Sequence, residues 1–523
     1  MSKKEFFNIF NTLSCVPKIL INESAIIFLR NECWIAGNIV DADGFMNISL
    51  ENAVYCDQKG LHYKMDNFTV RFRQILYLQI PDKCESNNKN YNKMTNQIKT
   101  FSLNDYDCIG FDLDNTLVKY NVKEMIFHEY KVISEFLVNR GYSKEFLLKP
   151  IEEGADFLQK GLILDFERGN LLRICPDGSI QIAAHGTKFL SRQEIREIYG
   201  EKQRWQVTDE YCKDMLVAWN GTLAESIRTC LDYFDMPAAL AFARIIDSID
   251  LEKGGRQEKY KVWPDVLAAL MSAYARELFA TKESKYFEAL KKNPEKFIHK
   301  CEPKVIDWLK LLKKEKKVFL ITGSHIDFAT LTAGWAIGEN WRDYFHLIIC
   351  YAKKPGFFTL NRDFLRLDGI KETDPIKAED MTPGSVYTQG NYRELTKFIA
   401  KITEKNDPKI LYVGDNLIQD VFTPNKHCNI DTIAIIEEMM SEGINYNPNY
   451  EILRSSVWGS YFHTNGEDTL WERIIRKHSK ICVPYVEELA KNPLDFKYKT
   501  FDPDNCSSCG YYPHDPFDVP TEP

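Results

Sequence analysis

Residues 107–120, DCIGFDLDNTLVKY, limit the fold of this chain more than any other segment. Their apolar run, Cys108–Phe111, ends directly in two acids, Asp112 and Asp114. Open α/β sheets bind ligands at the carboxyl ends of their strands, so acids at i and i+2 there can face one site. Asp112 can attack phosphorus, and Asp114 can protonate the leaving oxygen and then activate water. An Asp-rich turn without chemistry is the alternative interpretation.

Two later strand-like runs end in groups that suit a phosphate. The run 318–321 leads into Thr322 and Ser324, whose hydroxyls and neighbouring amides can hold phosphate oxygens. A Ser or Thr at such a place can equally cap the next helix. Lys354, in YAKKPGFF (351–358), can neutralise the phosphate and the nucleophile, or can be an ordinary surface lysine.

A second pair of acids follows a further strand-like run, 410–413. Asp415 comes almost directly after it, and Asp420 lies five residues later. Carboxylates are preferred ligands of Mg²⁺, which neutralises charge between an acid and a phosphate. Asp415 can ligate Mg²⁺, and Asp420 can orient Lys354 or a metal-bound water. A turn Asp and a helix-capping Asp are the alternative.

The four pieces occur in the order acid pair, hydroxyl, lysine, acid pair. In this order the chain resembles the haloacid-dehalogenase superfamily. It resembles the cytosolic purine 5′-nucleotidase branch of that superfamily in four segments: FDLDNTL, KVFLITGS, AKKPGFF and YVGDNLIQD. Five further segments are similar to one member of that branch: HGTK (185–188), YFDMPAALAFARIID (233–247), YTQGN (387–391), WGSYF (458–462) and GYYPHDP (510–516). The resemblance therefore covers residues 101–523.

This resemblance implies an α/β fold, with a Rossmann-like core and a large cap inserted within about residues 122–315. It implies Mg²⁺-dependent hydrolysis of nucleoside monophosphates through an aspartyl-phosphate. By motif match, the catalytic residues are Asp112, Asp114 and Lys354, the phosphate-binding residues are Thr322 and Ser324, and the metal-side acids are Asp112, Asp114, Asp415 and Asp420. The branch has Thr-Asn-Ser where this chain has Gly323 in the middle, so an Asn able to contact substrate is missing. A sugar phosphate or a phosphoprotein is an alternative substrate, because the core does not identify the leaving group.

Residues 1–84 differ from the rest of the chain in their sequence pattern. Strand-like runs rich in β-branched and aromatic residues occur at 25–29, 34–41, 46–56 and 68–80. They predict a small all-β unit, and the polar residues 85–100 that follow predict a linker.

Two segments of this unit, GNIVDADGFMNISL (37–50) and FTVRFRQILYLQIPD (68–82), resemble the motifs of an Sm-like domain, most of all one subunit of the U7 particle. The resemblance implies a five-stranded bent barrel that joins a ring of Sm-like subunits through its edge strands. It places four residues at a base of single-stranded RNA: Asp43, Phe45, Asn47 and Arg71. Phe72 stands where such domains usually have Gly or Cys.

Charge gives no separate support for RNA binding, because basic and acidic residues number nine each over residues 1–84. A barrel used only for protein contacts is therefore the alternative for this unit. For the whole chain, the rival hypothesis is an RNA-processing scaffold with a silent phosphatase domain. Since Met94 could begin a complete second protein, the chain is either a true fusion or two joined reading frames.

Two features predict where the protein lies. No run of about 18 apolar residues occurs, so we expect no membrane partner. The amino terminus lacks a secretory signal pattern, which predicts an intracellular protein with reduced cysteines. We expect a cytoplasmic location, or a nuclear one if the Sm-like unit is functional.

Overall fold

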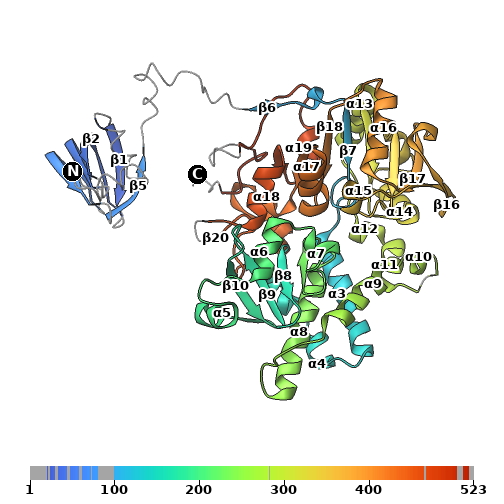
Figure 1. The fold of residues 1–523 in the computed structure, drawn as a ribbon, viewed down its shortest axis with the longest axis horizontal. Helices are drawn as coiled ribbons and strands as arrows, with labels where there is room; N and C mark the ends of the chain where they lie inside the picture. The colour runs from blue at the N-terminus through green and yellow to red at the C-terminus, as the bar shows by residue number, and fades with distance from the viewer. Residues whose placement is uncertain are drawn as a thin grey trace. The chain divides into compact units, whose positions relative to one another are not determined.

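The structure is a computed structural model, and it describes residues 21, 24–29, 33–43, 47–57, 62–71, 74–79, 99–281, 283–464, 467–502 and 510–517. The chain divides into two compact units, Met1–Gln97 and Ile98–Pro523. The described strands of the amino-terminal unit are blue in Figure 1. Among the described residues, no helix is long and apolar enough to cross a membrane.

The amino-terminal unit contains an antiparallel sheet in the order β4-β3-β2-β1-β5. Its strands are β1 (Ser24–Leu29), β2 (Trp34–Ala42), β3 (Ile48–Cys56), β4 (His62–Val70) and β5 (Ile75–Gln79). Alternate side chains such as Ile27, Ile35 and Leu50 are buried together, as the two-residue period of a half-buried strand requires. The run expected at 68–80 covers only the end of β4, which begins at His62, and then β5. The amide of Gln74 donates to the carbonyl of Arg71 between the two strands.

The carboxyl-terminal unit is built on a nine-stranded mixed sheet, in the order β16-β15-β17-β14-β13-β7-β18-β19-β22. The strands from β17 to β22 are parallel. They are β17 (Ser385–Gln389), β14 (Leu347–Cys350), β13 (Lys317–Ile321), β7 (Cys108–Phe111), β18 (Ile410–Gly414), β19 (Asp431–Ile435) and β22 (Ile481–Val483). The antiparallel hairpin of β15 (Phe364–Asp368) and β16 (Lys371–Ile376) extends one edge.

Helices cover both faces of this sheet, which explains why its central strands read as continuous apolar runs. On β13, Val318 and Leu320 pack in the same cluster as helix α13 (Pro303–Glu315) and α14 (Ile326–Ala336). Phe319 and Ile321 point to the other face and pack with α16 (Tyr392–Thr403). The α/β fold expected from the sequence is confirmed at this level.

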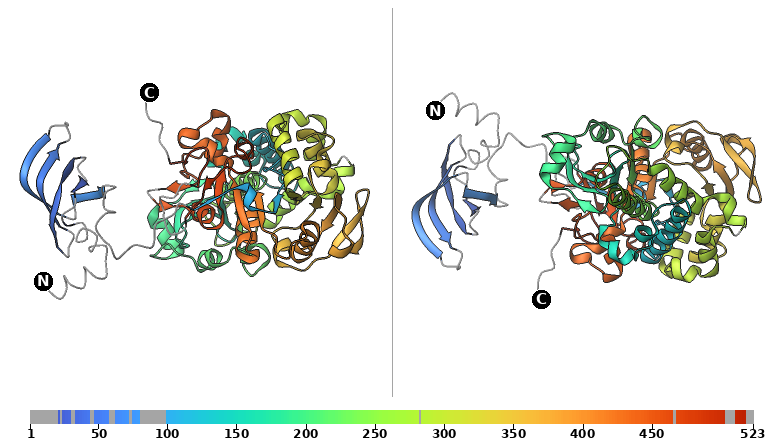
Figure 2. Two further views of the ribbon diagram at one scale, coloured as in Figure 1. Left: turned by 90° about the horizontal axis from the view of Figure 1, so that it is seen from above. Right: turned by 90° about the horizontal axis from the view of Figure 1, so that it is seen from below.

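A large insert separates β7 from β13. It contains helices α3 (Val122–Asn139), α8 (Met236–Lys253) and α9 (Trp263–Tyr274). It also contains a second sheet, β11-β10-β9-β8-β12, whose strands are β11 (Lys188–Phe189), β10 (Ile180–His185), β9 (Asn170–Ile174), β8 (Leu162–Asp165) and β12 (Ile227–Cys230). This sheet lies against the carboxyl-terminal elements (Figures 1 and 2) and shares a buried cluster with α18 (Leu470–His478).

The carboxyl-terminal tail also packs on this unit where the structure describes it. The amide of Cys482 donates to the carbonyl of Gly510, and Asn445 donates to the carbonyl of His514. Tyr511 is buried with Phe501. Residues 510–517 are therefore part of the folded unit.

Candidate active site

Four adjacent parallel strands, β14, β13, β7 and β18, bring the sequence motifs to one edge of the sheet. Asp112 follows β7, Thr322 follows β13, Lys354 follows β14 and Asp415 follows β18. The segments come from positions more than 300 residues apart, yet parallel strands place their carboxyl ends side by side.

Lys354 lies at the centre of this edge. Its Nζ is 2.7 Å from Oδ1 of Asp112 and 2.6 Å from Oδ1 of Asp420, and it donates to the hydroxyl of Tyr412 at 3.3 Å. Burial alone would lower the pKa of Lys354, but the two carboxylates raise it well above its ordinary value. Lys354 is thus a buried, permanently charged group and not a surface lysine.

Three acids at this edge suit a metal ion. One oxygen each of Asp112, Asp415 and Asp420 can be chosen so that all three lie within 4.8 Å of one another, and all three residues are buried. Burial raises the pKa of Asp420 to about 6, even though Lys354 acts to lower it. Three buried carboxylates against one ammonium leave an excess of negative charge, which fits a hard divalent cation with oxygen ligands.

The local sequence explains how Asp420 reaches this place. A Cβ on Gly414 would lie 2.4 Å from the Cβ of Asp420, so only glycine allows this approach. Asn416 then caps the following π-helix (Leu417–Phe422) by accepting from the amides of Ile418 and Gln419 at 3.2 Å and 3.1 Å.

Asp114 lies beside this group of acids but is not part of it. The Tyr120 hydroxyl donates to its Oδ1 at 2.7 Å, and the Ser324 hydroxyl donates to its Oδ2 at 2.6 Å. The Thr322 hydroxyl lies 3.5 Å from the same Oδ2. Burial raises the pKa of Asp114, although the hydrogen bonds from Ser324 and Tyr120 act to lower it. The structure therefore joins Asp114 to the hydroxyl motif.

A pocket of about 220 Å³ opens beside Asp114 and Ser324. Its remaining lining is mostly aromatic, with a few polar groups: Phe234, Tyr274, Arg276, Phe279, Phe287, Gly323, His325, Asp327 and Phe328. His325 stacks on Tyr351, with ring centroids 3.9 Å apart. Burial, together with nearby Arg276, lowers the pKa of His325 to about 4, so it is neutral at physiological pH.

The polar residues His185 and Arg173 of the insert make hydrogen bonds that stabilise the insert itself. His185 hydrogen-bonds to Asn170 at 2.7 Å and to Asp250 at 2.9 Å. Arg173 donates to Gln159 at 3.0 Å and also to two backbone carbonyls of residues 458–460. These contacts tie β9 and β10 to their surroundings, and none of them reaches the acids at the sheet edge.

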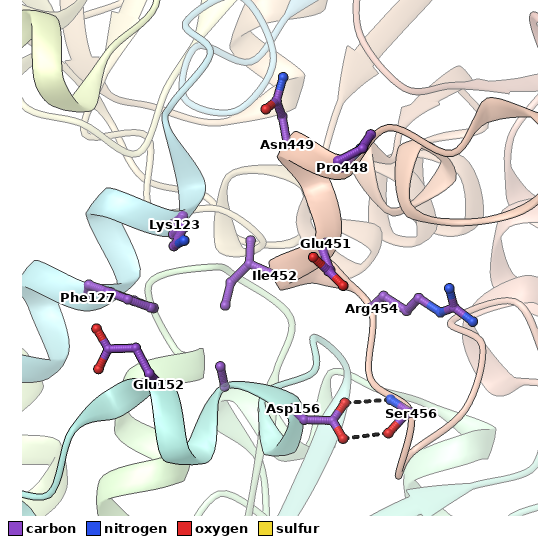
Figure 3. Close-up of a pocket in the computed structure, with 11 residues that line it drawn as sticks. Lys123, Phe127, Glu152, Asp156, Pro448, Asn449, Glu451, Ile452, Arg454 and Ser456 are labelled. Carbon is purple, nitrogen blue, oxygen red and sulfur yellow. Dashed lines mark hydrogen bonds between the residues drawn. The ribbon is translucent and has the colours of Figure 1, made fainter.

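A second hollow, of about 530 Å³, lies between α3, the 3₁₀ segment Ile151–Phe157 and the 3₁₀ segment Pro448–Leu453 (Figure 3). Lys123, Phe127 and Glu451 are among its lining residues. On one wall Asp156 accepts two hydrogen bonds from Ser456, at 2.6 Å and 2.5 Å (Figure 3). Its lining contains none of the acids, hydroxyls or lysine of the sheet edge.

In the amino-terminal unit, two of the expected RNA-contact residues are hydrogen-bonded to each other. Asp43 accepts from the backbone amide of Asn47 at 2.9 Å and from its side-chain amide at 2.7 Å. Arg71 is exposed. Phe45 lies outside the described residues.

Comparison with known proteins identifies the carboxyl-terminal unit. Residues 97–452 match the sequence model of the 5' nucleotidase family. The chain belongs to this family. Human 5'-nucleotidase domain-containing protein 1 is 33% identical over 458 residues, which cover 80% of this chain and 96% of that protein. Human 5'-nucleotidase domain-containing protein 2 is 25% identical over 376 residues, or 71% of this chain and 67% of that protein. The resemblance to 5'-nucleotidases expected from the sequence is confirmed. As a member of this family, the chain is a 5'-nucleotidase-like phosphatase.

The amino-terminal unit is Sm-like. Residues 18–80 match the LSM domain, and the described sheet has the five strands expected of such a unit. Among solved structures, the P. aerophilum SmAP1 heptamer matches 13% of this chain and 92% of its own chain, with 25% identity and a TM-score of 0.13.

Several features of this site were not predicted from the sequence. The hydroxyl of Tyr120 on Asp114 was not foreseen, although Tyr120 lies in the motif segment itself. Tyr412, which holds Lys354, lies inside a strand that reads as purely structural. The aromatic pocket was also missed, because its rings come from segments far apart in the sequence.

Proposed function

We propose that the carboxyl-terminal unit is a Mg²⁺-dependent phosphomonoester hydrolase of the haloacid-dehalogenase type, acting on nucleoside monophosphates. The observation that carries the proposal is the contact of Lys354 with both Asp112 and Asp420, at 2.7 Å and 2.6 Å. Asp114, which accepts a hydrogen bond from the Ser324 hydroxyl, lies beside this group. A nucleophile, a fixed cation and an acid/base thus meet at the carboxyl ends of adjacent parallel strands.

The proposed reaction has two steps. In the first, a carboxylate oxygen of Asp112 attacks phosphorus, the bond from phosphorus to the ester oxygen breaks, and Asp114 gives that oxygen a proton. In the second, Asp114 takes a proton from water, which attacks the aspartyl-phosphate and frees Asp112. Lys354 favours the ionised form of Asp112 before the attack, although burial raises the pKa of that acid, and holds its side chain in place from 2.7 Å.

Asp112, Asp415 and Asp420 are the side chains that would hold Mg²⁺. When bound, Mg²⁺ supplies positive charge that offsets these acids and the phosphate. Thr322 and Ser324 would hold phosphate oxygens through their hydroxyls after leaving Asp114. The sequence also suggested Asp114 as a metal-side acid, but it is not among the three acids whose oxygens lie within 4.8 Å of one another, so we propose it as the acid/base.

The substrate class follows from the pocket next to Asp114 and Ser324. Aromatic side chains such as Phe234, Tyr274 and Phe328 line it, and flat bases stack on such rings. A nucleoside joined to the phosphate would place its base among them. Gly323 lines this pocket where the branch has Asn, and a Cβ at this position would meet no atom within 4 Å.

For the amino-terminal unit we propose a role as a subunit of an Sm-like ring that contacts single-stranded RNA, with cytoplasmic or nuclear location. The supporting observation is the pair of hydrogen bonds by which Asp43 orients the amide of Asn47, as expected for a residue that reads a base edge. The edge strands β4 and β5 of its sheet would make the ring contacts. We further propose residues 1–84, 85–100 and 101–523 as barrel, linker and enzyme.

Phosphate release from a panel of nucleoside monophosphates tests the enzyme proposal. Wild type and Asp112→Asn are compared, each with Mg²⁺ and with EDTA. Release that requires Mg²⁺ and is lost in Asp112→Asn supports the proposal. If folded wild-type protein releases nothing from any nucleotide, sugar phosphate or phosphopeptide, the scaffold hypothesis replaces it. Release from a non-nucleotide alone would keep the mechanism and correct the substrate class.

A further inference from the structure

The two carboxylate oxygens of Asp114 have different neighbours. Oδ2 lies 2.6 Å from the hydroxyl of Ser324 and 3.5 Å from that of Thr322, on the side where a phosphate would be held. Oδ1 accepts a hydrogen bond of 2.7 Å from the hydroxyl of Tyr120. A carboxylate on a short side chain rotates unless each end is held, so these contacts define which oxygen faces the reacting atoms.

Tyr120 is itself fixed by its surroundings. It is 2% exposed, and its backbone pairs with Ile298 of the segment that leads to α13. Its ring meets that of Phe234 edge-on, with centroids 5.9 Å apart. The amides of Leu117 and Val118 both donate to the carbonyl of Leu113, which turns the chain back and brings residue 120 against Asp114. The Tyr120 hydroxyl is therefore a preorganised donor.

We propose that Tyr120 is a positioning residue for the hydrolysis: by holding Oδ1 of Asp114, it directs Oδ2 toward the leaving-group oxygen. The inference rests on the proposed function, in which Asp114 supplies the proton. In that step Asp112 forms the new bond to phosphorus, and the bond to the leaving oxygen breaks. The leaving oxygen keeps the electron pair and takes the proton from Oδ2. Ser324 turns to the phosphate, whereas Tyr120 keeps its contact with Oδ1.

A positioning role has a signature that a structural role lacks. A basic leaving group, such as a ribose 5′-oxygen or phenolate, needs the proton as its bond breaks, whereas p-nitrophenolate leaves without it. Loss of the Tyr120 hydroxyl should therefore slow the hydrolysis of esters with a basic leaving group and leave the hydrolysis of p-nitrophenyl phosphate nearly unchanged. General damage to the fold would slow both kinds equally.

The test uses the full chain with Mg²⁺ and three substrates: p-nitrophenyl phosphate, phenyl phosphate and the best nucleoside monophosphate of the panel. Tyr120→Phe should lower kcat about tenfold or more for the last two and less than about threefold for p-nitrophenyl phosphate, with KM little changed. Tyr461→Phe is the matched control. Tyr461 is also buried, and its hydroxyl has no hydrogen-bond partner among the described residues. It should leave all three rates within about twofold, because it removes a hydroxyl without a catalytic contact.

An equal loss on all three esters, or no loss on any, overturns the role of Tyr120. Asp112→Asn separates this failure from failure of the enzyme proposal, because it must remove hydrolysis of every ester. A wild-type protein that hydrolyses none of them overturns both. If Tyr120→Phe does not fold, 3,5-difluorotyrosine at position 120 replaces it. This change keeps the ring in place and strengthens the donor, so an unchanged ratio of the phenyl and p-nitrophenyl rates would then count against the proposal.

Discussion

Replacing Lys354 by methionine should destabilise the carboxyl-terminal unit by about 3–5 kcal/mol, the cost of removing one partner of a buried ion pair. The ammonium lies 2.7 Å from Asp112 and 2.6 Å from Asp420, and all three side chains are less than a tenth exposed. Methionine fills a similar space, so the effect comes from charge. Without the cation, two acids remain buried beside Asp415 with no positive group in contact.

Urea unfolding of the full chain in EDTA, followed by circular dichroism, measures this loss as a lower midpoint. Lys353→Met is the matched control, since Lys353 is the exposed neighbour and should change stability by no more than about 0.5 kcal/mol. Added Mg²⁺ should restore part of the loss in Lys354→Met, because a cation bound only by the folded acids stabilises them. The reasoning is refuted if Lys354→Met unfolds at the wild-type midpoint in EDTA, or if both lysine variants lose stability equally.

Three further changes follow from the structure. Gly414→Ala should lower the unfolding midpoint and remove phosphatase activity, since its Cβ would press on Asp420 at 2.4 Å, whereas Gly323→Ala has open space and should fold normally in the same thermal assay. Phe234→Ala should raise KM for nucleoside monophosphates and leave KM for p-nitrophenyl phosphate unchanged in steady-state kinetics. An unchanged KM for nucleoside monophosphates would contradict this prediction. Burial lowers the pKa of His478 from 6.5 to about 4. As pH falls from 6.5 toward 4, the unfolded state therefore binds a proton at this residue before the folded state does, and the free energy of unfolding decreases. His478→Gln should therefore reduce the fall in stability between pH 7 and pH 4 in urea titrations, and an unchanged slope would count against this.

The order of the catalytic motifs was predictable from the sequence because each motif is local. An apolar run that stops at Asp112, Thr322 or Asp415 already marks a strand end. Parallel strands bring such ends together whatever lies between them. The same logic applies to Asp43 and Asn47, which lie four residues apart in the sequence and hydrogen-bond to each other.

A large insert was expected from the family resemblance, but the residues that line the pocket could not be predicted in this way. Phe234, Tyr274 and Phe328 meet only because the insert packs on the sheet edge, and no periodic pattern links their positions. The contact of Tyr120 with Asp114 depends on a backbone turn whose geometry the sequence does not define. The split between β4 and β5 was missed because apolar and polar residues alternate without a clear turn signal at residues 71–74.

The measurement that tests the central claim most directly is detection of the phosphorylated enzyme. The full chain is mixed with its best monophosphate substrate and Mg²⁺, quenched in acid within one turnover, and digested for tandem mass spectrometry. The account predicts phosphate on Asp112 that hydroxylamine removes and that is absent from Asp112→Asn. Steady turnover without phosphate on Asp112, or turnover that survives in Asp112→Asn, would contradict it.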